Sequence, residues 1–144
     1  MIAVDTNILV YAHRADSPWH DAALVCVTEL AEGTVSWGIP WPCLHEFFAI
    51  VTHPRIYAPP TPIPKAIEQL DAWLESPTLA LLGESETHWP RLREVLRAGR
   101  VAGPQVHDAR IAAICSQHDI HELWTADRDF QRFPKLRTRN PLVG

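Results

Sequence analysis

The 144-residue sequence predicts an α/β protein in which helices cover both faces of a parallel sheet. Short apolar runs typical of strands alternate with longer amphipathic stretches typical of helices. An apolar share of 47% and a charged share of 21% are usual for a soluble globular protein. We therefore expect one domain that spans residues 1–144.

The first third of the chain supplies two of the expected strands. Ile2–Val4 is a short apolar run and predicts the first strand. Ser17 is a suitable N-cap and Pro18 a suitable first helical residue, so a helix is expected from there to a stop at Gly33. Val35–Ile39 predicts the second strand.

The middle of the chain contains two helices separated by an irregular segment. Pro42 opens the stretch "PCLHEFFAIVT", which predicts a helix that ends before Pro54. The proline-rich stretch "HPRIYAPPTPIP" predicts a loop or stiff connector. Lys65–Glu75 is amphipathic and predicts a helix, and Leu79–Leu82 predicts a strand.

The last third continues the alternation of helices and strands. Glu84–Ala98 predicts a helix closed by Gly99, and Gly103-Pro104 introduces a further helix, "QVHDARIAAICSQH". Glu122–Thr125 predicts a strand, and "DRDFQRF" a turn or a single helical turn. Leu136–Thr138 is the candidate for a last edge strand.

Several classes of protein are disfavoured by what the sequence lacks. No run approaches the roughly 18 apolar residues of a membrane span. Since the first residues show neither a basic n-region nor a small-residue cleavage site, we expect no signal peptide. The three cysteines, Cys26, Cys43 and Cys115, form no CxxC pair. We expect buried, reduced thiols in a cytoplasmic protein rather than disulfides or a zinc site.

Charge is distributed unevenly along the chain. Residues 1–90 hold 3 basic and 11 acidic residues, whereas residues 91–144 hold 10 basic and 6 acidic residues. The basic second half permits a surface for a polyanion, and solvated helix faces are the alternative explanation.

Four acidic residues have apolar neighbours that are unusual for a surface charge: Asp5, Glu46, Asp108 and Asp127. Each aspartate has a structural alternative, because Asp5 can cap a following helix, Asp108 can complement a helix dipole and Asp127 can form an Asx-turn. In a parallel sheet, however, sites form at the carboxyl ends of strands, where both Asp5 and Asp127 are expected.

Converging carboxylates require a counter-charge. Two carboxylates about 4 Å apart repel by roughly 4 kcal/mol at an effective dielectric constant near 20. No Lys or Arg is an obvious partner for Asp5 or Glu46, and the eight histidines form no HExxH motif for zinc. The sequence therefore favours Mg²⁺, or Mn²⁺ as the alternative, with Thr6 and Asn7 as supporting hydrogen-bonding groups.

Four motifs in this order, "VDTNILVYA", "LHEFFAI", "HDARIAAI" and "TADRDF", resemble those of the PIN-domain nucleases. The similarity covers essentially the whole chain and is greatest to the VapC-type ribonuclease toxins of bacterial type II toxin–antitoxin pairs. It implies a three-layer α/β/α fold with a central parallel sheet and a catalytic, metal-binding quartet. The quartet falls on Asp5, Glu46, Asp108 and Asp127.

The resemblance also assigns positions around the quartet. Thr125 and Asn7 match polar positions that support the acidic residues, and Asp129 is an auxiliary to Asp127. The expected activity is Mg²⁺- or Mn²⁺-dependent cleavage of RNA that inhibits translation or growth. Relatives usually form homodimers and are blocked by a small antitoxin protein. The basic residues expected to hold the RNA backbone are Arg91, Arg97, Arg128 and Arg132.

Three alternatives to a ribonuclease toxin remain at this point. The first is a catalytically silent module that binds RNA or protein through the acidic pocket. The second is a DNA-cleaving or flap-type nuclease on the same fold, which the short chain disfavours. The third is a haloacid-dehalogenase-like phosphatase, which needs a general acid where this chain has Asn7.

Overall fold

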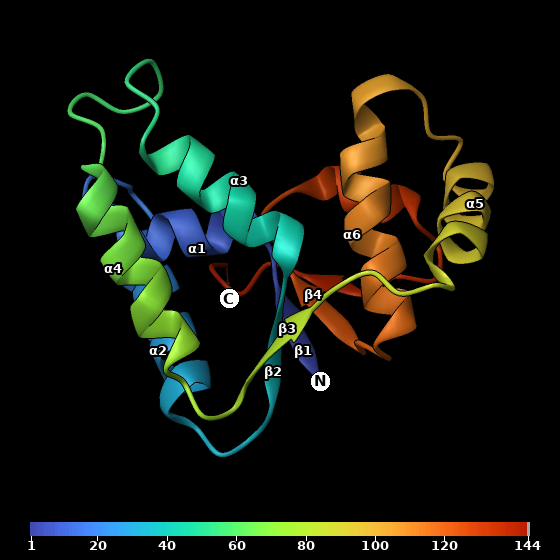
Figure 1. Cartoon of the computed structure of the whole chain (residues 1–144), viewed down its shortest axis with the longest axis horizontal. Helices are drawn as coiled ribbons and strands as arrows, with labels where there is room; N and C mark the ends of the chain where they lie inside the picture. Colours follow the sequence, from blue (N-terminus) through green and yellow to red (C-terminus); the bar gives the residue numbers. More distant parts are fainter. Residues whose placement is uncertain (144) are drawn as a thin grey trace.

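The computed structural model describes residues 1–143 and contains a five-stranded parallel sheet in the order β3-β2-β1-β4-β5 (Figure 1). The strands are β1 (Ile2–Val4), β2 (Trp37–Pro40), β3 (Leu79–Leu82), β4 (Glu122–Trp124) and β5 (Thr138–Arg139). The α-helices are α1 (Thr6–His13), α2 (His20–Glu32), α3 (Trp41–Val51), α4 (Ile63–Leu74), α5 (His88–Ala98) and α6 (Val106–Gln117). Two short 3₁₀ helices are η1 (Gly103–Gln105) and η2 (Arg128–Arg132).

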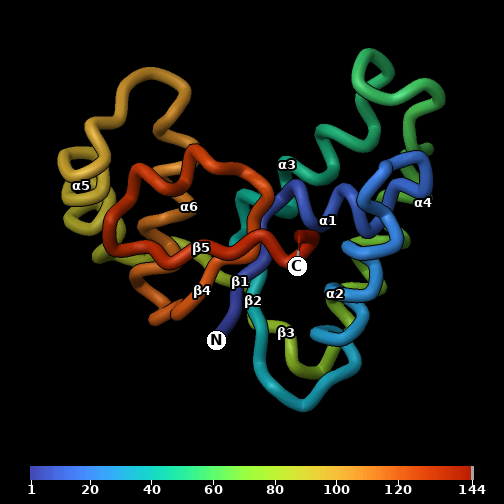
Figure 2. Tube along the Cα trace, turned by 180° about the vertical axis from the view of Figure 1, so that it is seen from behind, coloured from blue at the N-terminus to red at the C-terminus, as the bar shows by residue number. Residues whose placement is uncertain are grey.

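Helices flank the sheet on both sides, which confirms the predicted three-layer α/β/α architecture. Helices α1 to α4 lie on one side of the sheet, and α5 and α6 lie on the other (Figures 1 and 2). The chain moves from β1 outward through β2 to β3 and then crosses back to β4. The strand order therefore reverses between β1 and β4, and ligands in open α/β sheets bind at this kind of switch point.

The register of β1 and β4 sets which residues follow them side by side. Val4 pairs with Trp124, and the backbone N–H of Asp5 donates to the carbonyl of Trp124 at 3.0 Å. Asp5 and Thr125 are thus the next residues on two adjacent parallel strands, at the same edge of the sheet.

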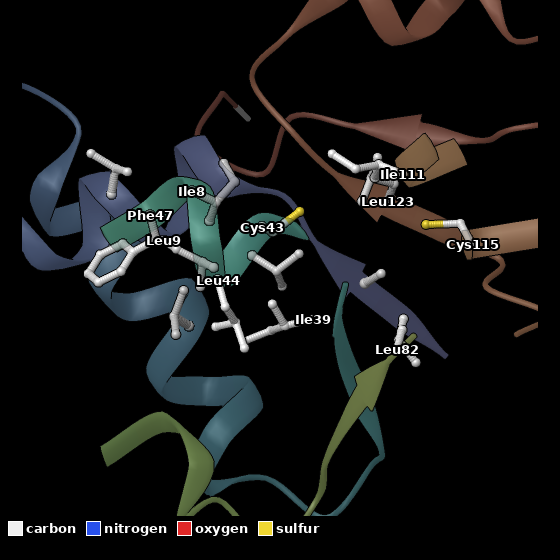
Figure 3. Packing of buried hydrophobic residues seen from close by; sticks show 14 of the residues in the cluster. Ile8, Leu9, Ile39, Cys43, Leu44, Phe47, Leu82, Ile111, Cys115 and Leu123 are labelled. Atoms are coloured by element: carbon white, nitrogen blue, oxygen red, sulfur yellow. The ribbon is translucent and has the colours of Figure 1, made fainter. Parts of the chain in front are cut away.

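The apolar core fills both sides of the sheet. On one side, the fully buried Ile8 and Leu9 of α1 lie near Phe47 of α3 (Figure 3). On the other side, Ile111 of α6 lies close to Leu123 of β4. This packing fixes α1, α3 and α6 against the strand ends, so side chains at the starts of these helices are held in place.

Two helices begin later than the sequence predicts. Helix α2 begins at His20 because Ser17 forms a turn instead of a cap, with its Oγ accepting from Trp19 N at 3.1 Å. Helix α5 begins at His88 rather than Glu84, since Ser85 Oγ accepts from the backbone N–H of Thr87 at 3.2 Å. Helices α3, α4 and α6 begin and end within two residues of the predicted positions.

Two strands are displaced toward the C-terminus. Strand β2 covers Trp37–Pro40 instead of Val35–Ile39, because Val35 lies in the preceding loop with 74% of its surface exposed. The edge strand β5 contains Thr138 and Arg139, whereas Leu136 is held in a turn by its N–H bond to the carbonyl of Phe133.

Cys43 and Cys115 are buried, as predicted, whereas Cys26 is only half-buried, so the prediction of a buried thiol is wrong there. Within residues 1–143, none of the helices combines the length and the apolar character needed to cross a membrane.

Candidate functional site

Asp5 is a buried carboxylate whose two oxygens are surrounded by donors. Only 4% of its surface is exposed. Oδ1 accepts from the backbone N–H of Thr6 at 2.8 Å, which caps α1, and from the Cys43 thiol at 3.5 Å. Oδ2 accepts from the Thr125 hydroxyl at 2.8 Å and from the Asn7 amide at 3.3 Å. The capping alternative is therefore confirmed, but capping uses only one of these four contacts.

Thr125 connects the ends of β1 and β4. Its hydroxyl donates to Asp5 and accepts from Asn7 Nδ2 at 3.2 Å and from the backbone N–H of Asp127 at 3.0 Å. Asn7 Oδ1 accepts from the backbone N–H of Ala126 at 3.1 Å. The predicted supporting residues Asn7 and Thr125 thus fix both Asp5 and the backbone that leads to Asp127.

Three aspartates gather beside this network. Asp108, in the first turn of α6, Asp127 and Asp129 each offer a carboxylate oxygen, and the three oxygens lie within 4.8 Å of one another. Asp127 forms the Asx-turn that precedes η2, with Oδ1 accepting from the backbone N–H of Asp129 at 2.8 Å. This turn brings Asp129 to the cluster alongside Asp127.

Glu46 of α3 reaches the same region through Thr6. Its Oε2 accepts from the Thr6 hydroxyl at 3.2 Å, and its side chain is half-buried rather than enclosed by the apolar helix around it. Thr6 therefore contacts Asp5 through its backbone and Glu46 through its hydroxyl.

Burial and like charges raise the pKa of two of these acids. The pKa of Asp5 rises to about 6, chiefly because the carboxylate is buried, although hydrogen bonds from Thr125, Thr6 and Cys43 oppose the rise. The pKa of Asp108 also rises to about 6, through burial and then the charges of Asp127, Asp5, Glu46 and Asp129. The four predicted acids and Asp129 therefore repel one another within one site.

The donor set fits a hard divalent cation. The cluster of Asp108, Asp127 and Asp129 offers carboxylate oxygens alone, the ligands that Mg²⁺ and Mn²⁺ prefer. The Lys and Arg ion pairs found among residues 1–143 all use other carboxylates. A cation bound here would relieve the repulsion that raises the pKa of Asp108.

The four predicted basic residues divide into two groups. Arg128 and Arg132 lie in η2, which begins directly after Asp127. Arg91 and Arg97 lie in α5, and α6 stands between α5 and the centre of the molecule (Figure 1). Arg91 is half-buried and donates to Ser116 of α6 at 3.3 Å.

One contact with Asp5 escaped the sequence analysis. Cys43 is fully buried in α3 and donates to Asp5, although in the sequence it resembles an ordinary core residue. The available signal is its spacing of three residues before Glu46, which puts both residues near one side of α3.

Comparisons with known proteins agree with this fold. The PIN domain family model matches residues 2–136. Ribonuclease VapC43 of Mycobacterium tuberculosis is 36% identical over 144 residues, covering 100% of this chain and 97% of the relative. Ribonuclease VapC48 of the same organism is 31% identical over 140 residues, covering 97% of each chain. The crystal structure of VapBC2 from Rickettsia felis bound to a DNA fragment from their promoter matches with a TM-score of 0.69 and 23% identity, covering 96% of this chain and 98% of that chain.

Thr125→Val tests the network that joins β1 to β4. The substitution removes a donor to Asp5 and the acceptor of two N–H groups, so we expect the free energy of unfolding to fall by about 2 kcal/mol. Thr125→Ser keeps the hydroxyl and should cost less than about 1 kcal/mol. Urea denaturation monitored by circular dichroism measures the free energy of unfolding of both variants. Equal losses of this free energy in Thr125→Val and Thr125→Ser would refute the role of the hydroxyl.

Asp108→Asn tests the repulsion within the cluster. Because the pKa of Asp108 is raised to about 6 in the folded state, the folded protein binds more protons than the unfolded chain between about pH 4 and 6. The contribution of the Asp108 carboxyl group to the free energy of unfolding is therefore present at low pH and lost as pH rises through 6. At pH 7 with a chelator, we expect the variant to be more stable by about 1 kcal/mol, a figure reduced for solvent screening.

The matched control is Asp71→Asn, at an exposed position of α4. It should leave the free energy of unfolding unchanged within about 0.5 kcal/mol. We compare the gain in the free energy of unfolding that Asp108→Asn produces at pH 5 and at pH 8. Equal gains at the two pH values would contradict the electrostatic explanation.

Proposed function

Because this chain belongs to the PIN domain family and to its VapC group, we propose that it is a metal-dependent endoribonuclease that hydrolyses phosphodiester bonds in RNA. The observation that carries the proposal is the cluster of Asp108, Asp127 and Asp129, which Thr125 links to Asp5 at the switch point of the sheet. The names of the related ribonucleases VapC43 and VapC48 support the same activity.

The acidic residues have distinct parts in this proposal. Asp5, Glu46, Asp108 and Asp127 would hold Mg²⁺ or Mn²⁺, with Asp129 as an auxiliary to Asp127. Of these, Asp108, Asp127 and Asp129 already bring carboxylate oxygens within 4.8 Å of one another. When bound, the cation supplies activation of water and neutralises the charge that develops on the phosphate. Either Asp127 or Glu46 accepts a proton from the attacking water at a carboxylate oxygen.

The remaining residues orient these groups. Thr6 fixes Glu46 Oε2, and Thr125 fixes the backbone of Asp127, so that both carboxylates are positioned before the substrate arrives. Arg128 and Arg132 extend from η2 beside the cluster and hold the phosphates of the RNA backbone.

We propose further that the ribonuclease is the toxin of a toxin–antitoxin pair. Its action on RNA would inhibit translation or growth, and a small cognate antitoxin would block it. The similar structure from Rickettsia felis is of VapBC2 bound to a DNA fragment from their promoter, which supports a protein partner of this class. We also propose that the protein is a cytoplasmic homodimer.

Membership of the PIN domain family overturns the phosphatase alternative. Asn7, which stands where such a phosphatase needs an acid, instead donates its amide to Asp5. The catalytically silent module remains the competing proposal, and cleavage assays separate the two.

The assay compares purified wild type with Asp108→Asn and Asp127→Asn on single-stranded RNA. With Mg²⁺ or Mn²⁺ present, we expect the wild type to cut the RNA and each variant to lose about a hundredfold or more in rate. The exposed Asp71→Asn serves as the control and should retain full activity. RNA cleavage at the wild-type rate by both variants, or cleavage by the wild type in excess chelator, would defeat the nuclease proposal.

A further inference from the structure

We propose that the cavity between α5, α6 and residues 133–136 binds an unpaired nucleobase of the RNA substrate, an inference that rests on the proposed ribonuclease function. The cavity has a volume of about 280 Å³. Its apolar walls come from both helices and from the segment after η2, and they include Val95, Ala98, Ala112, Phe133 and Leu136.

The cavity exists because α5 packs incompletely on α6. No residue of α5 is fully buried, although its apolar side chains Leu92, Val95 and Leu96 contact the core. The ring of Phe133 occupies the space next to Gly99, where an added Cβ would come within 2.9 Å of it. Aliphatic side chains, with only the small exposed part of Phe133 (4% of its surface), thus bound a space open to a flat apolar group.

The size and the lining suit one base. A volume of about 280 Å³ is at the lower limit for small-molecule pockets, which excludes a drug-sized ligand but admits a single ring system. Proteins read single-stranded RNA by taking bases out of the stack and packing them against aromatic side chains. The polar rim, which includes Ser116 and Asp119, supplies groups that can bond to the edge of the base.

The surroundings of the cavity are complementary to the charge of RNA. The segment 88–100 carries four arginines against one acid, and residues 133–139 carry three basic residues and no acid. Arg91 and Lys135 stand on the rim itself. The rim acid Glu94 is paired with Lys135 at 2.5 Å, so its charge is already compensated. The same pair compensates the charge of Lys135, and the rim also carries the acid Asp119, so phosphates beside an inserted base would meet Arg91 and the arginines of the two flanking segments.

Helix η2 connects the cavity to the acidic cluster. It begins after Asp127, which belongs to the cluster, and ends before Phe133, which lines the cavity. At the rise of a 3₁₀ helix, these two residues are about 12 Å apart, a span of a few nucleotides. Arg128 and Arg132 lie along this path, and within residues 1–143 the buried Arg132 Nε has no hydrogen-bond partner. One strand of RNA can therefore reach both sites.

Ala98→Phe tests the proposal, because Ala98 is exposed at the cavity and a phenyl group there would fill it without disturbing the core. The probe is a short single-stranded RNA that the wild-type protein cuts, bound in a chelator that prevents cleavage. We expect the Kd to rise about tenfold, the usual loss of one stacked base. The matched control, Ala22→Phe on the exposed face of α2, should leave the Kd unchanged.

A second measurement uses the wild-type protein alone. A single abasic site is moved along the same RNA, and we expect one position, a few nucleotides from the cut, to bind about tenfold more weakly. The cavity proposal would be overturned by equal Kd values for Ala98→Phe and Ala22→Phe, or by a Kd that does not depend on the position of the abasic site. RNA cleavage by the wild-type protein would still support the proposed function in either case. A wild-type protein that cuts no RNA would instead defeat the proposed function itself.

Discussion

The hydrogen bond from the Thr125 hydroxyl to the buried carboxylate of Asp5 holds together two strand ends that are 120 residues apart in sequence. Around it, the first turn of α1 is capped by Asp5, and the backbone of Asp127 is held by Thr125. These contacts place the start of η2 beside the first turn of α6, where Asp108 lies. The position of Asp127 in the acidic cluster thus depends on the hydrogen bonds of Thr125 and Asn7 at the switch point of the sheet.

Placing an ionised carboxylate in a nearly closed site is unfavourable unless donors surround it. Asp5 has four such donors, yet its pKa is still raised to about 6, because burial outweighs them. The pKa of Asp108 is also raised to about 6, by burial and then by the charges of its acidic neighbours. A site that keeps several like charges together at the expense of stability is typical of a functional centre, and a hard cation is the partner that would relieve it.

Much of the fold and part of the candidate site could be predicted from the sequence. The alternating pattern predicts that Asp5 and Asp127 lie at one edge of a parallel sheet, whereas the pairing of β1 with β4 that makes them neighbours is seen only in the structure. The spacing of Cys43 and Glu46 places both near one side of α3, but which residue Cys43 meets depends on how α3 packs against the end of β1. Asp129 joins the cluster through the local Asx-turn of Asp127, whereas α5, which carries Arg91, lies beyond α6 (Figure 1). Tertiary packing decides the placement of α5, and the starts of α2 and α5 depend on the competing hydrogen bonds of local Ser and Thr turns.

The most direct test of the central claim is the position of bound Mn²⁺, measured by anomalous diffraction from crystals of the wild-type protein soaked in the ion. The account predicts a peak among the carboxylate oxygens of Asp108, Asp127 and Asp129, with Asp5 still bonded to Thr125. Mn²⁺ bound only at some other surface, or no uptake at millimolar concentrations, would contradict it.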